Sequence, residues 1–500
     1  MNISSAYETI KANIGADGRL PQGFSLKKED TPNQISFAPG AEDGIFPTGT
    51  IDEQAIQRLV ALLKEYFRAS SPQCLSEIEA ILKEHRAISL IDPVLESIQK
   101  DHEGVDPNRL ANLSFYLAKT SSNEELIKIA LGLLGMFDLS HIPEVCEVIF
   151  TLGLYEEFTL FSAAAVLGWA NGNQMIFRLA KSVSGWGKIQ AVECLEPETE
   201  EIREWILHNG CANDIMNAYL GLACAVKGDL ISVLRRDFID AETFECAGVI
   251  IDALLDEGPA LGISGYEHAR EALLRYLGHA KQHARSIEHL CRILDLQRWA
   301  ENAEIDGKEE IHAGCDEVIG KRRWAEQIID AVKQQEKGFE LFCACRAADY
   351  LGIDVSVLLF EKIQRDPIGY CSYIPRLMKK PDMALQMIEL YEAVLPLEDM
   401  AEGMGDYFFA DKLKQEYQCL EFVLQELAKY PLRGVRLVKT GLNSRVIRER
   451  NMAICVLSGW SESEGRPLAD LSPELYAEVA RIYQVEVNEK TKEAMKKLLG

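Results

Sequence analysis

The sequence lacks any long apolar run and has far fewer basic than acidic residues. No stretch of its 500 residues approaches the ~20 apolar residues of a membrane span. The N-terminal stretch MNISSAYETIKANIG lacks the basic segment and following apolar run of a signal peptide. Lys and Arg number 53 against 78 Asp and Glu, a net charge of −25, whereas binding nucleic acid or anionic membranes requires positive surface. We therefore expect a cytoplasmic protein whose main partner is neither nucleic acid nor a membrane.

Strand signals and nucleotide-binding motifs are also missing. Alternating apolar and polar runs are few, and β-branched clusters bounded by tight turns are almost absent. No P-loop occurs, because the pair Gly187-Lys188 is followed by Ile189, and the GMG of residues 403–405 lacks the third glycine of a dinucleotide motif. These absences predict an all-α fold and argue against a standard NAD or ATP site.

Metal-ligand patterns are weak. His279 and His283 are spaced one helical turn apart, but Ala280 stands where a zinc protease needs Glu, and a solvated basic helix face is the alternative. A di-iron site needs two Glu-x-x-His motifs, and only Glu309 to His312 occurs. Patterns for non-haem iron and for a haem thiolate are absent too. We therefore predict no resident cofactor.

Cysteine is present, but in no disulfide or redox pattern. The thirteen cysteines are an odd number scattered singly through helical patterns, as Cys194 and Cys224 illustrate. Scattered cysteines of this kind are usually small core residues of proteins that work in a reducing compartment. Cys343 and Cys345 would point to different faces of a helix, so we interpret them as packing residues rather than a redox pair.

What the sequence does contain is an internal repeat between residues 156 and 258. Four alanines recur at spacings of 27, 27 and 29 residues, and a glycine or aliphatic residue follows each of them after four positions. The four pairs are Ala164 with Gly168, Ala191 with Leu195, Ala218 with Leu222, and Ala247 with Ile251. Further apolar residues follow after a polar or Gly/Pro break, which is typical of a helix pair. Helix pairs at a fixed period predict an α-solenoid of the HEAT or armadillo kind.

Composition changes at about residue 50. Residues 1–50 are rich in Gly, Pro, Asn and Asp and predict a mostly non-helical N-terminal arm. Two interpretations are open: the arm is disordered, or it lies along the solenoid through its apolar residues, which are Leu20, Phe24, Ile35, Phe37 and Ile45. The helical period begins at Ile51, so residues 51–500 are expected to form the solenoid.

The first helix is expected over IDEQAIQRLVALLKEYF, with one apolar face made of Ile56, Leu59, Val60, Leu63 and Phe67. Further helices should follow near 74–86, 92–101, 106–119 and 122–136. Asn123 or Ser122 is a plausible N-cap of the last of these.

Two surface features suggest binding sites. Tryptophans fall in adjacent repeats with polar residues at nearby loop ends, and the set is Trp169, Asn171, Asn173, Trp186, Trp205, His208 and Asn209. Such residues suit partner recognition on a concave face, although a Trp at a helix start often only fills the gap between repeats.

The second feature is a strongly basic stretch, with Arg433, Arg436, Lys439, Arg445, Arg448 and Arg450. It would receive an anionic group, or it is a solvated face that balances neighbouring acidic repeats.

The block GWGKIQAVECLEPETEEIREWILHNGCANDIMNAYLGLACA, with ERNMAICVLSGW later, resembles HEAT-like repeat proteins. Its period is shorter than the about 40–47 residues usual for HEAT and armadillo units. Over most of its length the chain also looks like bacterial proteins named limonene hydroxylase. That resemblance implies hydroxylation of a monoterpene, linked dehydrogenation of carveol or perillyl alcohol, NAD(P)H and a cofactor that activates oxygen. It brings no catalytic motif, so no active-site residue is transferred.

Two functions follow from these observations. The first is a scaffold that binds another protein along the concave face of the solenoid without chemistry of its own. The alternative is the terpene oxidoreductase, for which an apolar cavity between repeats, lined by Trp169, Trp186 and their neighbours, would be favourable evidence.

Overall fold

Every regular element that the structure describes is a helix. The computed structural model describes residues 4–26, 37–45, 52–100, 106–320, 324–407 and 414–500. Within these ranges a single isolated bridge, between Tyr407 and Val446, is the only strand-like feature. The all-α prediction is confirmed. None of the helices in these ranges has both the length and the apolar content that a bilayer crossing needs.

The chain divides into two compact units, a division that the sequence did not indicate. The first unit comprises residues 1–284 and 295–321, and the second comprises residues 285–294 and 322–500. Helix α17 (Ile287–Asn302) therefore contributes residues to both.

The α-helices of the first unit are α1 (Ala6–Ala12), α2 (Ala41–Ile45), α3 (Glu53–Ala69), α4 (Pro72–Glu84), α5 (Ala87–Lys100), α6 (Pro107–Thr120), α7 (Glu124–Leu134), α8 (Pro143–Gly153), α9 (Glu156–Val166), α10 (Gly172–Ser182), α11 (Gly185–Cys194), α12 (Glu200–Trp205), α13 (Ala218–Lys227), α14 (Leu230–Leu234), α15 (Ala241–Leu255), α16 (Ala269–His283) and α18 (Lys308–Gly320). A π-helix (Ile206–Gly210) continues α12, and a 3₁₀ turn (Ile263–Gly265) precedes α16.

The α-helices of the second unit are α19 (Trp324–Gln334), α20 (Phe339–Tyr350), α21 (Ser356–Arg365), α22 (Ile374–Leu377), α23 (Pro381–Val394), α24 (Leu397–Met400), α25 (Gln415–Leu427), α26 (Val435–Leu442), α27 (Ile447–Glu464), α28 (Leu468–Leu471), α29 (Pro473–Tyr483) and α30 (Glu489–Leu499). A 3₁₀ turn (Cys371–Tyr373) runs into α22.

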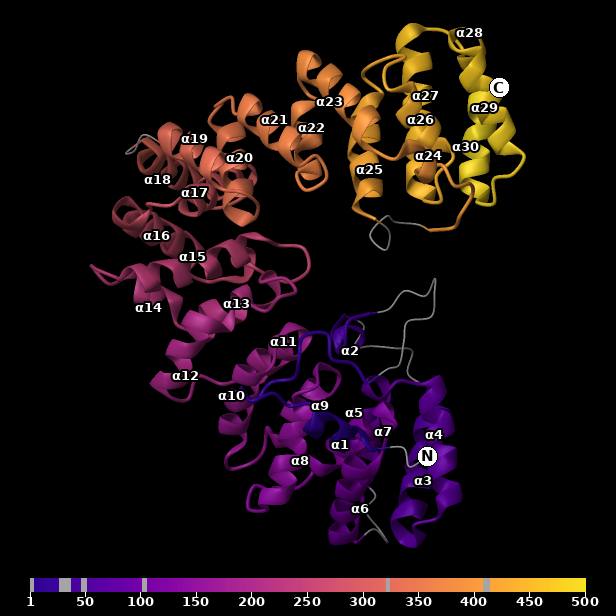
Figure 1. The fold of residues 1–500 in the computed structure, drawn as a ribbon. Coiled ribbons are helices and arrows are strands. Elements are labelled where there is room, and N and C mark those ends of the chain that lie inside the picture. Colours follow the sequence, from indigo (N-terminus) through magenta and orange to yellow (C-terminus); the bar gives the residue numbers. More distant parts are fainter. Residues whose placement is uncertain (1–3, 27–36, 46–51, 101–105, 321–323, 408–413) are drawn as a thin grey trace. The chain divides into compact units, whose positions relative to one another are not determined.

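Alternate helices of the first unit pack on one another in series. Helix α7 packs on α9, α9 on α11, α11 on α13 and α13 on α15, while α8 and α10 lie against α9 (Figure 1). The seventh residue of each of the helices α9, α11, α13 and α15 is small and buried: Ser162, Ala191, Cys224 and Ala247. A small side chain there lets the neighbouring backbone come close, because a Cβ added at Gly210 would lie 2.9 Å from the Cys224 sulfur.

The repeat register expected from the sequence is therefore only partly right. Ala191 and Ala247 occupy this small buried position, but Ala164 is exposed on α9 and Ala218 is the first residue of α13. The segments that join the helices differ in length, since a π-helix and residues 211–217 intervene before α13. A constant spacing of alanines consequently does not follow the helix pairs.

The starts of helices follow the capping chemistry that the sequence suggests. The side chain of Asn123 accepts the Leu126 N–H at 3.1 Å, so Asn123 is the cap of α7.

Helix α5 begins at Ala87, five residues before the expected start at 92, and carries Pro93 in its interior. The buried face that includes Leu90 and Val94 sustains the helix despite the missing proline N–H.

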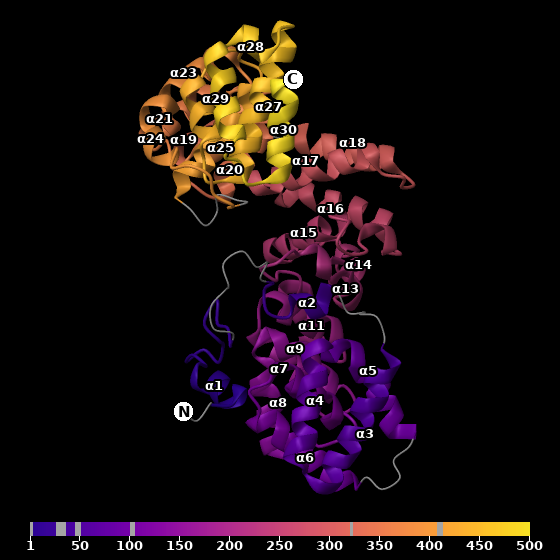
Figure 2. The same cartoon turned by 90° about the vertical axis from the view of Figure 1, so that its right-hand side faces the viewer.

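The described parts of the N-terminal arm contact helices of the first unit, but not through all of the apolar residues that were expected to make these contacts. The arm contains two short helices: α1 packs on α6 and α8, and α2 packs on α11 (Figures 1 and 2). The Ala6 N–H donates to the Ser121 carbonyl at 3.0 Å, and the ring of Phe24 meets Tyr155 edge-on at 5.7 Å. Phe37 and Ile45 are largely exposed, and Ile35 and Ile51 lie outside the described residues.

A buried ion cluster fixes α2 against the unit. The ammonium of Lys128 on α7 is fully buried and lies 2.7 Å from carboxylate oxygens of Asp43 on α2, Glu125 and Glu157. Burial alone would lower the pKa of Lys128, but the three carboxylates together raise it above its ordinary value. The other oxygen of Glu157 accepts the Gly40 N–H at 2.7 Å. The cluster therefore joins the arm to α7 and α9 by charge-assisted hydrogen bonds.

Helix α27 carries the most buried charges of the second unit that the structure describes. Arg450 donates to both carboxylate oxygens of Glu486, at 2.7 and 2.9 Å, and to the Ser444 carbonyl at 2.8 Å, and neither charged side chain is exposed. Its neighbour Glu449 is also fully buried. Burial raises the pKa of Glu449 to about 8, with a further increase from Glu421 and an opposing effect of the Ser444 hydroxyl.

Replacing Glu449 with Gln should remove a dependence of stability on pH. A carboxyl whose pKa is raised on folding binds its proton more tightly in the folded state, so stability is present at pH 4.5 and is lost as the pH rises toward about 8. At pH 7 we expect Glu449→Gln to be more stable than the wild type by up to about 3 kcal/mol. Thermal unfolding at pH 5 and pH 8 measures this. The control Glu464→Gln, on the exposed end of α27, should depend on pH as the wild type does. The same change in melting temperature between pH 5 and pH 8 in all three proteins would contradict the account.

Candidate functional site

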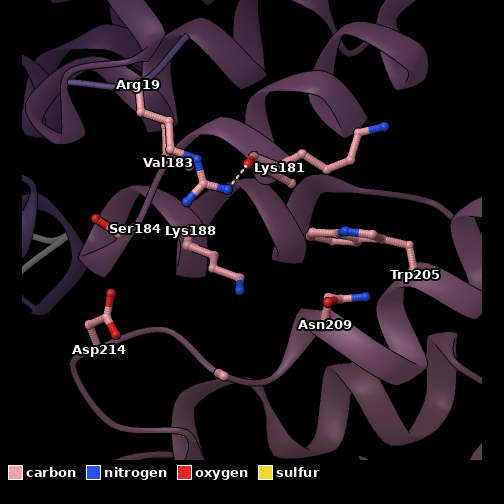
Figure 3. Close-up of a pocket in the computed structure, with 10 residues that line it drawn as sticks. Arg19, Lys181, Val183, Ser184, Lys188, Trp205, Asn209 and Asp214 are labelled. Atoms are coloured by element: carbon pink, nitrogen blue, oxygen red, sulfur yellow. Dashed lines mark hydrogen bonds between the residues drawn. The ribbon is translucent and has the colours of Figure 1, made fainter. Parts of the chain in front are cut away.

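A polar pocket of about 400 Å³ lies in the first unit, within the size range of small-molecule sites. It is lined by the end of α10, the start of α11, α12 with its π-helix, the loop after it and the arm (Figure 3). Its residues are Arg19, Ala180, Lys181, Val183, Ser184, Lys188, Trp205, Asn209, Ala212 and Asp214. Two of the seven residues predicted to bind a partner, Trp205 and Asn209, are among them.

The position of Lys188 is set by the way α11 begins. The half-buried carboxylate of Glu156 accepts the Trp186 N–H at 3.0 Å. Burial raises the pKa of Glu156, and the backbone N–H groups that it accepts oppose that shift. Gly185 has φ = 52°, and a Cβ there would lie 2.3 Å from the Glu156 carboxylate, so the approach requires glycine. Lys188 follows about one turn later and extends its side chain into the pocket (Figure 3).

Trp205 and Asn209 come from the helix on the other side of the pocket. The indole of Trp205 meets Phe177 edge-on, with ring centroids 5.5 Å apart. The wider π-helical turn follows directly and carries Asn209, and such turns often occur at functional sites. The next loop holds Asp214 at φ = 68°, and the buried side chain of Asn213 accepts the Ile215 and Met216 N–H groups and braces it.

The positive charges of the pocket make no direct ion pairs that the structure describes, although Asp214 lines the same pocket. Among the residues that the structure describes, no carboxylate lies within ion-pair distance of Arg19 or Lys188. Burial lowers the pKa of Lys188, and its ammonium lies 5.8 Å from the Trp205 ring centroid. Arg19 donates to the Lys181 carbonyl at 2.6 Å, while the Lys181 ammonium points away and lies over Phe177 (Figure 3).

The other residues predicted to bind a partner do not line this pocket. Trp169 and Trp186 are buried, with only 5% of each exposed, and Trp186 packs against Tyr219 and the arm residue Gly44. Their positions agree with the alternative that such tryptophans fill gaps between helices. The remaining three lie elsewhere on the unit: Asn171 is exposed, Asn173 bonds the backbone of Glu196, and His208 is half-buried.

The basic stretch near residue 440 is largely paired with carboxylates. Lys439 pairs with Glu474, Arg445 with Glu402 and Arg448 with Glu421. The Arg436 guanidinium donates to the Glu392 backbone carbonyl, and the Arg433 side chain is exposed. The three ion pairs already compensate much of the charge that would attract an anion. The geometry favours the second interpretation, a face balanced by neighbouring acidic residues.

The histidine and cysteine patterns serve packing. His279 is buried with its Nε2 3.0 Å from the Leu234 carbonyl, and His283 stacks on Phe244. Cys343 and Cys345 are buried, and none of the thirteen cysteines, all of which are described, forms a disulfide. In the described ranges no three His, Cys, Asp or Glu side chains are grouped so that they could hold a metal ion.

Helix α20 of the second unit exposes two aromatic rings on one face. Phe339 and Phe342, 68% and 49% exposed, stack with centroids 6.5 Å apart. The Arg346 guanidinium lies 5.5 Å from the Phe342 ring. The spacing i, i+3, i+7 places the three side chains along one stripe of the helix, which we call the α20 stripe. The sequence FELFCACR carries a signal for this stripe, but the spacing of the repeats does not distinguish its two phenylalanines from core residues.

Comparison with known proteins adds no relative to these observations. No protein-family model matches the chain, and a search of the curated proteins finds no similar one. The geometry of the pocket and of the α20 stripe therefore carries the functional argument.

Proposed function

We propose that the chain is an α-solenoid of HEAT-like helix pairs that works by binding another protein, without chemistry of its own. The observation that carries partner binding is the α20 stripe, because Phe and Arg are enriched in protein interfaces and exposed aromatic pairs are costly to keep in water. The repeat part of the proposal rests on the serial packing of α7, α9, α11, α13 and α15.

The stripe offers enough apolar surface to matter for affinity. Covering the exposed parts of Phe339 and Phe342 would contribute on the order of 3 kcal/mol. Arg346 would add a cation held by an aromatic ring, a combination that often forms the energetic centre of an interface. The stripe therefore has the composition of a compact interface centre.

The terpene oxidoreductase receives no support from the two cavities described here. The apolar cavity between α8, α9 and α10, lined by residues such as Phe150, Met175 and Leu179, holds only about 10 Å³. A cavity of about 150 Å³ is what accepts benzene, and a monoterpene is larger than benzene. The larger pocket is lined by charged groups, and a hydrocarbon there would desolvate cations without compensation.

Site-specific photo-crosslinking in the native host tests partner binding. A benzophenone side chain placed at position 342 should give one discrete adduct, identified by mass spectrometry, because that position lies in the α20 stripe. Phe339→Ser should weaken this adduct. The control places the same group at Tyr116, which is 56% exposed on α6 of the first unit. The same adducts at both positions, or none at 342, would contradict the proposal.

A further inference from the structure

The pocket of the first unit, which we call the Arg19–Lys188 pocket, has features of a ligand site that are separate from the α20 stripe. It is walled by elements that other contacts hold in place: α11 is anchored by Glu156, Trp205 is braced by Phe177, and the loop at Asp214 is braced by Asn213. Side chains fixed in this way are organised before a ligand arrives, which lowers the entropy lost on binding.

Its charges select an anion. A half-buried lysine usually forms an ion pair with a carboxylate. The Lys188 ammonium instead lies near the Trp205 indole, and no carboxylate among the described residues is within ion-pair distance of it. Arg19 reaches the same pocket from the arm with one N–H group on the Lys181 carbonyl, and its fork has further donors. The pocket also contains one carboxylate, that of Asp214. Two cations face this single carboxylate without a direct ion pair, so in a chain of net charge −25 the pocket is a local site for an anionic group.

The remaining lining indicates what else the ligand carries. The Trp205 ring offers a face on which a flat group can pack, with Asn209 beside it, and Ser184 and Asp214 offer hydrogen bonds on the opposite side of the pocket (Figure 3). We propose that the Arg19–Lys188 pocket binds a small organic anion, with its carboxylate or phosphate group between Arg19 and Lys188 and a flat apolar group against Trp205. This site does not depend on the proposed partner binding, because it lies in the other unit.

Calorimetric titration of the full chain tests the site with three probes of similar size. Phenyl phosphate and benzoate carry the two anionic groups, and benzyl alcohol is the neutral counterpart. We expect at least one of the two anions to bind saturably, with an affinity that falls as the salt concentration rises. Benzyl alcohol should not bind. Binding of only one anion supports the site and identifies its head group.

Single substitutions then locate the binding. Lys188→Met and Arg19→Gln should each weaken anion binding by at least about tenfold, the loss expected for one charge-assisted contact. Arg19 is on the exposed surface of the arm, so its variant keeps the test valid even if Lys188→Met disturbs folding. The control Lys83→Met removes an exposed lysine at the end of α4 and should bind as the wild type does.

Three results would overturn the proposal. The first is that the wild type binds neither anion. The second is that Lys188→Met and Arg19→Gln both bind the anions as tightly as the wild type. The third is saturable binding of a tetraglutamate peptide without binding of either small anion, which would assign the pocket to an acidic protein segment instead.

Discussion

Lys128→Met is expected to destabilise the first unit by about 3–5 kcal/mol, because it removes the buried ammonium that three carboxylates share, of which Asp43 keeps a second cation, Arg86. The Lys128 ammonium touches Asp43, Glu125 and Glu157, and the first and last of these carboxylates are themselves buried. Hydrogen exchange of the amides of α7, α9 and residues 37–45 measures the free energy of local opening. Faster exchange in all three segments is the expected result.

Two further variants separate the buried cluster from a general effect of losing a lysine. Lys119→Met removes the lysine of a surface pair with Glu144 and should leave the exchange rates close to those of the wild type. Adding Glu157→Gln to Lys128→Met removes one of the carboxylates that contacted the ammonium and should recover part of the lost protection, whereas Asp43 keeps its pair with Arg86. Unchanged exchange in Lys128→Met would show that the arm is not held by this cluster.

Arg450→Leu should destabilise the second unit by a similar amount, about 3–5 kcal/mol. The variant removes the guanidinium that pairs with Glu486, and the Glu486 carboxylate then stays buried without the one cation that the structure describes beside it. Hydrogen exchange of α27 and α30 is the direct measurement, since these helices pack on each other. Arg448→Leu, on the same helix but 46% exposed at its side chain, should change little.

A double variant tests whether the cost is the stranded charge. Arg450→Leu with Glu486→Leu replaces the ion pair with apolar groups and should be more stable than Arg450→Leu alone. If the double variant were no more stable than the single one, the loss would come from packing of the arginine stem instead.

The helices could be predicted from the sequence more reliably than their partners. The apolar period on α3 is read correctly, with Leu59, Leu63 and Phe67 all buried, because helical spacing is a local property. The start of α5 was placed too late because Pro93 reads as a break, whereas tertiary packing of its apolar face keeps the helix intact. The division into two units depends on long-range contacts, which no local pattern carries.

The same limit applies to the Arg19–Lys188 pocket. Trp205 and Asn209 were singled out because they fall at helix ends in adjacent repeats, but Lys188 and Arg19 were not. Arg19 reaches the pocket from the arm, and its hydrogen-bond partner Lys181 is 162 residues away in sequence. Lys128 did leave a local signal, a single lysine within the otherwise apolar sequence LIKIALGLL, although the sequence does not identify Asp43 as its partner.

We propose that the protein acts by holding a partner on the α20 stripe. The most direct test of this proposal is a titration of the purified full chain with the partner identified by crosslinking at position 342. We expect Phe342→Ala to raise the Kd by at least about tenfold, as truncation of a central aromatic residue does, and Tyr116→Ala to leave it unchanged. Equal affinity of the wild type and Phe342→Ala for that partner would contradict the account.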